Sequence, residues 1–231
     1  FDPEPTFKGI LFAKELVARG FEVEGITGFP NYPGGVLYEG YRIKLIQKEK
    51  VDGVLITRVP LFPSHDKSKF GRIANYISFA LSSLIYGLIF AKRPHLIYAY
   101  HPPLTVGVSA IIIKLFRRVP IVLDIQDMWP DTLRATGMIS NSYILGFIKK
   151  ICNLVYSSVT KIVVLSPGFK DLLTKRGVPY HKIEVIYNWA DETILRHTNS
   201  APPEELIRID GFKILFAGNI GQAQGLEVIL G

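Results

Sequence analysis

The sequence predicts an α/β fold, in which a parallel sheet carries helices on both faces and a second α/β unit begins near the end of the chain. Three observations predict it. Short apolar segments alternate with longer amphipathic ones, which is the pattern of a parallel sheet covered by helices. Hydrophobic residues make up 48% of the 231 residues and charged residues 20%, so the chain can bury a sizeable core. Polar residues follow several apolar segments directly, as in sheets that bind ligands at the carboxyl ends of their strands.

The first elements are the less regular ones. Ile10–Arg19 has apolar residues on one side and is followed by a glycine, which predicts an amphipathic helix. A strand is expected over Phe21–Thr27, followed by a long loop rich in glycine and proline. Two more strands, Tyr41–Gln47 and Val54–Val59, are expected on either side of a hairpin turn near Asp52-Gly53.

The next part alternates regularly between strand and helix. Expected strands are Leu96–Tyr100, Ile121–Ile125, Lys161–Leu165 and Ile183–Ile186, and expected helices are Phe70–Ala91, Leu104–Phe116 and Ser142–Ser158. Ser166-Pro167 predicts the start of another helix, because proline suits the first helical turn. The chain then becomes polar, which predicts an inter-domain connection, and Phe212–Ala217 is expected to be the first strand of a second Rossmann-like unit.

The bulk chemistry excludes several functions. The net charge is +7, and a basic surface attracts phosphates. No recognition-helix or RNP-like pattern accompanies the charge, so no nucleic-acid partner is expected. The single cysteine, Cys152, allows no internal disulfide, and no cysteine–histidine cluster has the spacing of metal ligands. Walker A, HExxH and GxSxG motifs do not occur.

One apolar segment leaves two interpretations open. Tyr76–Ala91 is shorter than the ~20 residues that a helix needs to span a bilayer. It is either a buried helix packed on the sheet, or a helix that also touches a membrane. In the second case basic neighbours such as Lys92 and Arg93 would contact lipid phosphates.

Candidate site residues follow the expected strands. These are His101, Asp127, Ser166 and Asn188. Asp124 lies inside an apolar strand, so its carboxylate needs a partner or a place at a cleft. For Asp127, a helix N-cap and an active-site role both remain open, whereas Asp131 is expected to be a cap.

A glycine-bearing loop follows the last expected strand. Phe216–Leu226 contains Gly218, Asn219, Gly221 and Gln224 and leads into a helix. Backbone N–H groups at such a helix start suit a diphosphate. The spacing is not GxGxxG, which argues against a dinucleotide site.

Taken together, these segments resemble glycosyltransferase family 4 of the GT-B fold. The likeness rests on pieces that occur in the order of the family: Phe1–Pro5, Gly28–Gly35, His101–Leu104, Asp127–Asp131, Asn188–Asp191, Gly218–Gly221 and Gln224–Leu226. Within the family the chain resembles the O-antigen and capsule biosynthesis subgroup, namely enzymes described as N-acetyl-L-fucosamine transferases.

The resemblance implies two Rossmann-like domains that face each other across a cleft. Residues 1–190 would be the acceptor-side, amino-terminal GT-B domain without its first strand, 191–210 the inter-domain connection, and 211–231 the beginning of the carboxy-terminal nucleotide-sugar domain. The implied reaction is a retaining transfer without metal or cofactor, from a nucleotide-sugar substrate, taken to be a UDP-linked N-acetylated amino sugar. The implied acceptor is a polyprenyl-diphosphate-linked saccharide, at the inner face of a bacterial cytoplasmic membrane, with peripheral membrane contact.

The resemblance also implies roles for single residues. Donor diphosphate contacts are implied for Gly9, Gly218, Asn219, Gly221 and Gln224, acceptor-side places for His101, Trp129 and Asn188, and orientation of the acceptor hydroxyl for Asp127. Many family members have an arginine and a lysine at the positions of Asn219 and Gln224, so this chain lacks two charges there. The donor-gripping carboxylates of the family would follow Gly231, so we expect this chain alone to be inactive.

Two other functional interpretations remain. A non-catalytic acceptor- or membrane-binding module would not need the expected strand and glycine-bearing loop at Phe212–Gly225. A GT-B sugar-nucleotide epimerase would need several acid–base carboxylates and histidines around the nucleotide, and the sequence offers no such set.

Overall fold

A computed structural model describes residues 8–32, 34–64, 69–189, 201, 204, 208, 210–216 and 225–230. The elements are α1 (Gly9–Ala18), β1 (Glu24–Gly28), β2 (Gln47–Val51), β3 (Val54–Val59), α2 (Lys69–Ile89), β4 (Ile97–His101), α3 (Leu104–Arg117), β5 (Ile121–Ile125), α4 (Asp131–Ala135), α5 (Ser142–Ser158), β6 (Lys161–Val164), α6 (Pro167–Lys175), the 3-10 turn η1 (Tyr180–Lys182), β7 (Ile183–Val185) and α8 (Glu227–Leu230).

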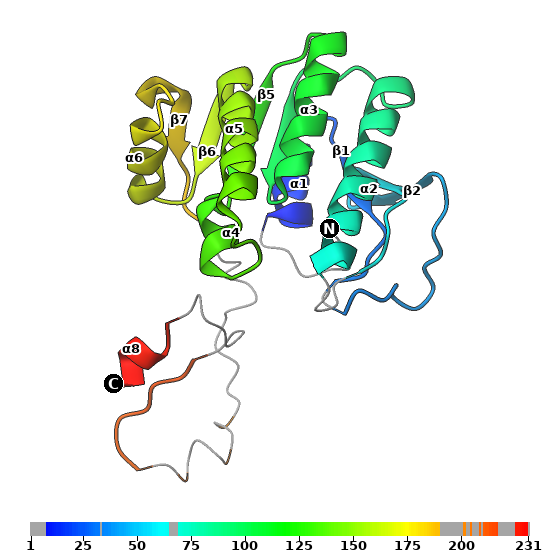
Figure 1. Ribbon diagram of the computed structural model, residues 1–231. Coiled ribbons are helices and arrows are strands. Elements are labelled where there is room, and N and C mark those ends of the chain that lie inside the picture. The colour runs from blue at the N-terminus through cyan, green and yellow to red at the C-terminus, as the bar shows by residue number, and fades with distance from the viewer. Residues whose placement is uncertain are drawn as a thin grey trace.

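The strands form two sheets. β4, β5, β6 and β7 lie in that order in a parallel sheet, and β1, β3 and β2 form a three-stranded sheet in which β1 is parallel and β2 antiparallel to β3. α2, α3 and α5 stand side by side over one face of this layer, and α1 lies behind it (Figure 1). The predicted α/β class, a largely parallel sheet with helices on both faces, is confirmed.

The core sits between β5, β6 and the helices that cover them. Ile121, Leu123 and Ile125 of β5 are fully buried, as expected for a central parallel strand covered on both faces. α3 approaches α5 closely through Gly107, where an added Cβ atom would lie 2.9 Å from Cγ1 of Val155. Substitution of this glycine would therefore force the two helices apart.

The predicted start of α6 is confirmed. Ser166 is the N-cap, its side chain accepts a hydrogen bond from the amide of Phe169 at 3.3 Å, and Pro167 begins the helix. Such a cap satisfies one amide that the first helical turn leaves unpaired.

The strand expected over Tyr41–Gln47 is wrong, because the strand lies at Gln47–Val51. The turn at Asp52 and Gly53 decides this, since both residues have positive φ angles of 48° and 84°. Such a two-residue turn joins the strands directly on either side of it. Val51 therefore pairs with Val54, and the alternating apolar residues Ile43 and Leu45 stay exposed in a loop.

The strand expected over Phe212–Ala217 is not formed by its described part. Residues 212–216 have no regular secondary structure, and Phe212 and Ile214 are largely exposed. A parallel strand is stable only when neighbours supply its hydrogen bonds, and no described residue pairs with this segment. Ala217 lies outside the described residues.

Candidate functional site

The carboxyl ends of the parallel strands bring several of the predicted residues to one edge of the domain. His101 is the last residue of β4, where it pairs in register with Ile125 of β5. Asp127 follows β5 by two residues, and Asn188 follows β7. The start of α1 lies at the same edge, at the lower side of the sheet in Figure 1.

A buried ion pair forms the centre of this edge. The Lys8 ammonium lies 2.8 Å from Oδ2 of Asp124, and the two side chains are 2% and 0% exposed. Asp124 also accepts hydrogen bonds from the hydroxyl of Tyr98 and, at 2.5 Å, from Nε2 of Gln126. The expectation that Asp124 needs a partner is confirmed, and the partner is the residue that immediately precedes α1.

Aromatic rings enclose the ion pair. The Lys8 ammonium lies 5.5 Å from the ring centroid of Trp189, within the range of a cation–π interaction. Phe12 packs between Tyr98 and Trp189, with centroid distances of 4.9 and 6.0 Å. Burial, assisted by the hydrogen bond to Asp124, raises the pKa of Tyr98, so its hydroxyl stays a donor.

His101 lies next to this cluster, fully buried. Its ring meets the edge of Trp129 at a centroid distance of 5.6 Å and an interplanar angle of 75°. Burial lowers the pKa of His101 to about 4, so the ring is neutral at pH 7. Among the described residues, neither ring nitrogen has a hydrogen-bond partner. The structure thus brings two predicted acceptor-side residues, His101 and Trp129, into contact.

Asp127 is half-buried, and no helix begins at it, which excludes the cap interpretation. Burial raises the pKa of its carboxyl group. Burial, then the charges of Asp124 and Asp127, also raise the pKa of Tyr100, so this phenol lies within electrostatic reach of both carboxylates. No residue in the described part of the chain donates a hydrogen bond to the Asp127 side chain.

The cap expected at Asp131 is wrong. The N-cap of α4 is Pro130, whose side chain cannot cap, and Asp131 is the first helical residue. The Asp131 carboxylate instead forms an ion pair with Arg176, which also donates to the carbonyl of Trp129 at 3.1 Å. The pair fixes the loop that carries Trp129 against the end of α6.

The remaining predicted residues are only partly placed. Gly9 is the first residue of α1 and not part of a preceding loop. Asn188 is exposed, and its neighbour Trp189 makes the contact with Lys8. The predicted diphosphate contacts Gly218, Asn219, Gly221 and Gln224 lie outside the described residues. Within the described residues, no three acidic, histidine or cysteine side chains lie together as metal ligands would.

Sequence reasoning missed four members of this site: Lys8, Tyr98, Gln126 and Trp189. Only one signal in the sequence points toward Lys8, namely that a buried Asp124 carboxylate needs a cationic partner. Tyr98 lies within β4 and Gln126 directly follows β5, and no local sequence pattern distinguishes either residue as part of a site.

Comparisons with known proteins agree on one family. The model of the Glycosyl transferase 4-like domain matches residues 11–189. WcaI of Escherichia coli (strain K12), named as a colanic acid biosynthesis glycosyl transferase, is 26% identical over an alignment of 229 residues that covers 93% of this chain and 55% of that protein. WbjE of Pseudomonas aeruginosa, named as a glycosyltransferase, is 28% identical over an alignment of 116 residues that covers 47% of this chain and 28% of that protein.

The chain thus spans about half the length of the first of these relatives and less of the second. The family match extends from the first turn of α1 to Trp189, so it includes every strand of the two sheets. On this match the chain belongs to the Glycosyl transferase 4-like domain family.

Proposed function

We propose that this chain is the acceptor-side domain of a retaining glycosyltransferase of surface polysaccharide synthesis. The donor is a nucleotide-sugar, taken as a UDP-linked N-acetylated amino sugar, and the acceptor is a polyprenyl-diphosphate-linked saccharide at the inner face of the bacterial cytoplasmic membrane. The family match supports the transfer of a sugar, and the names of the two relatives support a biosynthetic role. The likeness to N-acetyl-L-fucosamine transferases supplies the choice of sugar.

One observation carries the proposal. Asp127 is a half-buried carboxylate at the carboxyl end of β5 without a hydrogen-bond partner in the described part of the chain. Ligands of open parallel sheets bind at this end. A carboxylate in this place accepts a hydrogen bond from an acceptor hydroxyl and orients the oxygen toward the donor sugar, which contributes through positioning.

The surroundings of Asp127 support this role. Tyr98, Lys8 and Gln126 hold the neighbouring Asp124 carboxylate from three sides. Asp124 is therefore saturated, and Asp127 is left as the carboxylate that faces a ligand. Trp129 is half-buried and packs edge-on against the buried, neutral ring of His101. In this proposal the exposed part of the Trp129 ring supplies the aromatic surface that suits the carbon face of a sugar ring.

The chemical step depends on stabilisation of the leaving group. Cleavage of the bond between sugar and diphosphate develops negative charge on the diphosphate, and helix-start amides and cations near it lower the barrier. In this proposal the glycine-bearing loop around Gly218 binds the diphosphate, and the departing phosphate, not Asp127, takes up the proton of the acceptor hydroxyl. No metal is required.

The test is Asp127→Asn in a chain extended through the second domain, assayed with nucleotide-sugar donors and a polyprenyl-diphosphate saccharide. Loss of the ionic acceptor should lower kcat by about a hundredfold, as expected for a misplaced reactant, with thermal stability unchanged or higher. Asp171→Asn is the matched control and should keep full activity, because this carboxylate is exposed on α6. Full activity of Asp127→Asn, or transfer by the present chain alone, would contradict the proposal.

A further inference from the structure

Helix α2 turns its polar side chains inward. Asn75 donates to the carbonyl of Phe62 at 2.8 Å, Ser78 accepts from the amide of Phe62 at 2.8 Å, and Ser82 donates to the carbonyl of Pro60 at 2.5 Å. These side chains form hydrogen bonds with the backbone C=O of Pro60 and with the backbone N–H and C=O of Phe62, in the segment that follows β3. Ser78 and Ser82, which interrupt the apolar sequence of this helix, therefore make their hydrogen bonds on the side of the helix that faces the domain.

Ala80 and Tyr86 of α2 are buried in the domain, but other apolar side chains of this helix face outward. Exposed residues recur every four positions, which places them in one stripe along the helix: Ile73, Ile77, Leu81, Ile85 and Ile89. Leu81 and Ile85, in the middle, are 55% and 53% exposed. The outer side of a surface helix is ordinarily polar when the domain is surrounded by water.

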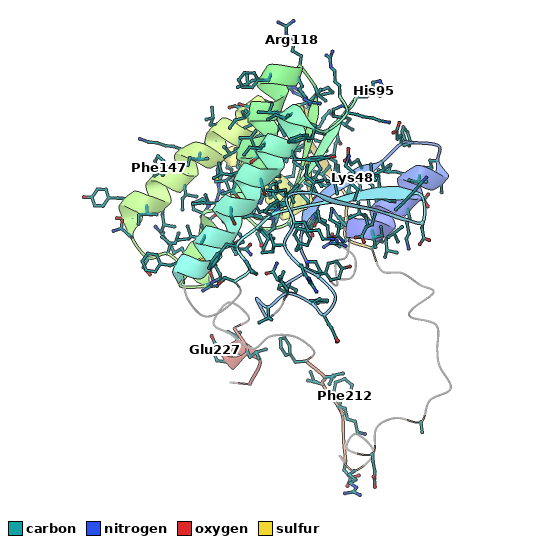
Figure 2. The ribbon with its side chains drawn as sticks, turned by 90° about the vertical axis from the view of Figure 1, so that its right-hand side faces the viewer. Lys48, His95, Arg118, Phe147, Phe212 and Glu227 are labelled. Atoms are coloured by element: carbon teal, nitrogen blue, oxygen red, sulfur yellow. The ribbon has the colours of Figure 1, made fainter. Side chains whose placement is uncertain are left out.

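The stripe continues over the neighbouring helices. α3 packs against α2 along its length, and its end exposes Leu115 and Phe116, while α5 exposes Phe147 and Leu154. We call the outer surface of α2, α3 and α5 the helical face. Figure 2 shows Phe147 at the outer side of this layer, opposite to Lys48 on β2. An exposed apolar surface of this extent marks an interaction site.

The charges of the helical face all have one sign. The sequences of α2, α3 and α5 contain no aspartate or glutamate, although the chain has 20 acidic residues. The same three helices contain Lys69, Arg72, Lys114, Arg117, Lys149 and Lys150. Exclusion of acidic residues from three separate helices indicates that the partner is anionic.

Further cations lie at one end of the helical face. Arg93, Phe116, Arg117 and Arg118 line a shallow hollow of about 410 Å³. Arg117 donates to the carbonyls of Leu88 and Ala91 and so closes the end of α2, while Arg93 and Arg118 are exposed. Arg118 lies at the edge remote from the carboxyl ends of the strands (Figure 2). The hollow combines an exposed aromatic ring with guanidinium groups, as at a membrane–water interface.

We propose that the helical face docks on an anionic lipid bilayer, with the isoleucine and leucine stripe in the acyl boundary and the cations on lipid phosphates. A bilayer supplies both an apolar layer and an adjacent plane of negative charge. By length and composition the segment Phe70–Ile89 could cross a membrane. Its inward hydrogen bonds, and that of Ser109 to the carbonyl of Ala80 at 2.9 Å, hold it on the domain instead. This inference rests on the proposed function in one respect: docking on the bilayer would give the enzyme access to its lipid-linked acceptor.

The experiment is co-sedimentation of the full-length protein with vesicles of phosphatidylcholine, alone or mixed with phosphatidylglycerol, at low and high salt. We expect binding to the mixed vesicles that weakens with salt. Each cation near an anionic surface is worth roughly fivefold in partition, so Lys149→Glu/Lys150→Glu should lower binding at least tenfold. Leu81→Ser/Ile85→Ser should lower it similarly at both salt concentrations.

Matched control variants lie on the opposite side of the domain. Leu45 is exposed in the loop before β2, and Lys44 and Lys50 are exposed near it. Leu45→Ser and Lys44→Glu/Lys50→Glu should bind vesicles as the parent protein does. Circular dichroism of every variant checks the fold.

Three results would overturn the inference: no binding of the parent protein to mixed vesicles, equal losses in the control variants, or a concentration-dependent dimer that Leu81→Ser/Ile85→Ser abolishes. The last would assign the helical face to a second copy. Transferase assays with a lipid-free acceptor separate this inference from the proposed function. The face variants should keep turnover there, whereas failure of the proposed function would abolish turnover and leave vesicle binding intact.

Discussion

Replacement of Lys8 by methionine tests the buried ion pair between the start of α1 and β5. Methionine keeps the apolar stem but leaves the Asp124 carboxylate, which is 0% exposed, without its cation. Loss of one partner of a buried pair costs about 3–5 kcal/mol. Tyr98 and Gln126 still donate to Asp124, so we expect the lower end, a loss of about 3 kcal/mol in the free energy of unfolding.

The assay is urea unfolding followed by circular dichroism. The double variant Lys8→Met/Asp124→Asn removes both charges and should be more stable than Lys8→Met, with a coupling energy of at least about 2 kcal/mol. Lys14 provides the control, because its partner Asp52 is 65% exposed. Lys14→Met should cost less than about 1 kcal/mol.

The reasoning would be refuted by a loss in Lys8→Met no larger than that in Lys14→Met. It would equally be refuted by additive effects in the double variant, since additivity means that the two charges do not interact.

Three further predictions concern buried groups. Burial lowers the pKa of His101 to about 4, so between pH 6.5 and pH 4 the unfolded chain binds a proton that the folded chain does not. The free energy of unfolding should therefore be highest above pH 6.5 and fall by about 3 kcal/mol toward pH 4. In urea titrations, His101→Phe should flatten this decline. Burial raises the pKa of the Cys152 thiol to about 11, so a disulfide reagent at pH 8 should modify it only as fast as the protein opens; rapid modification of the folded protein would contradict this. Gly107→Ala, with its Cβ 2.9 Å from Val155, should cost about 1–3 kcal/mol, whereas Gly146→Ala in open space should stabilise α5 by up to about 1 kcal/mol.

The regular part of the fold was predictable because its signals are local. Ile121–Ile125 reads as a buried strand, and the structure places β5 at the same residues. The Ser166 cap likewise needs only its own sequence neighbourhood. The strand expected over Tyr41–Gln47 is displaced because the residues with positive φ angles, Asp52 and Gly53, form a two-residue turn. Pairing therefore starts directly beside the turn, at Val51 and Val54.

The candidate site was predictable only in part, because its contacts join residues that are far apart in the sequence. The need of Asp124 for a cation follows from burial alone. The identity of that cation does not, since Lys8 is 116 residues away. The same holds for Asp131, whose partner Arg176 lies 45 residues later. Local propensity suggests a cap for such an aspartate, and tertiary pairing overrides it.

The distance in sequence between Lys8 and Asp124 also bears on how the domain folds. The β1–β3–β2 sheet and the β4–β7 sheet each form from pairs much closer in the chain, whereas the ion pair closes a loop of 116 residues. Long loops are entropically expensive to close before other contacts exist. The pair therefore forms after both sheets, so Lys8→Met should leave the folding rate almost unchanged and speed unfolding. The buried charge pair then lengthens the lifetime of the folded domain without changing the speed at which it forms.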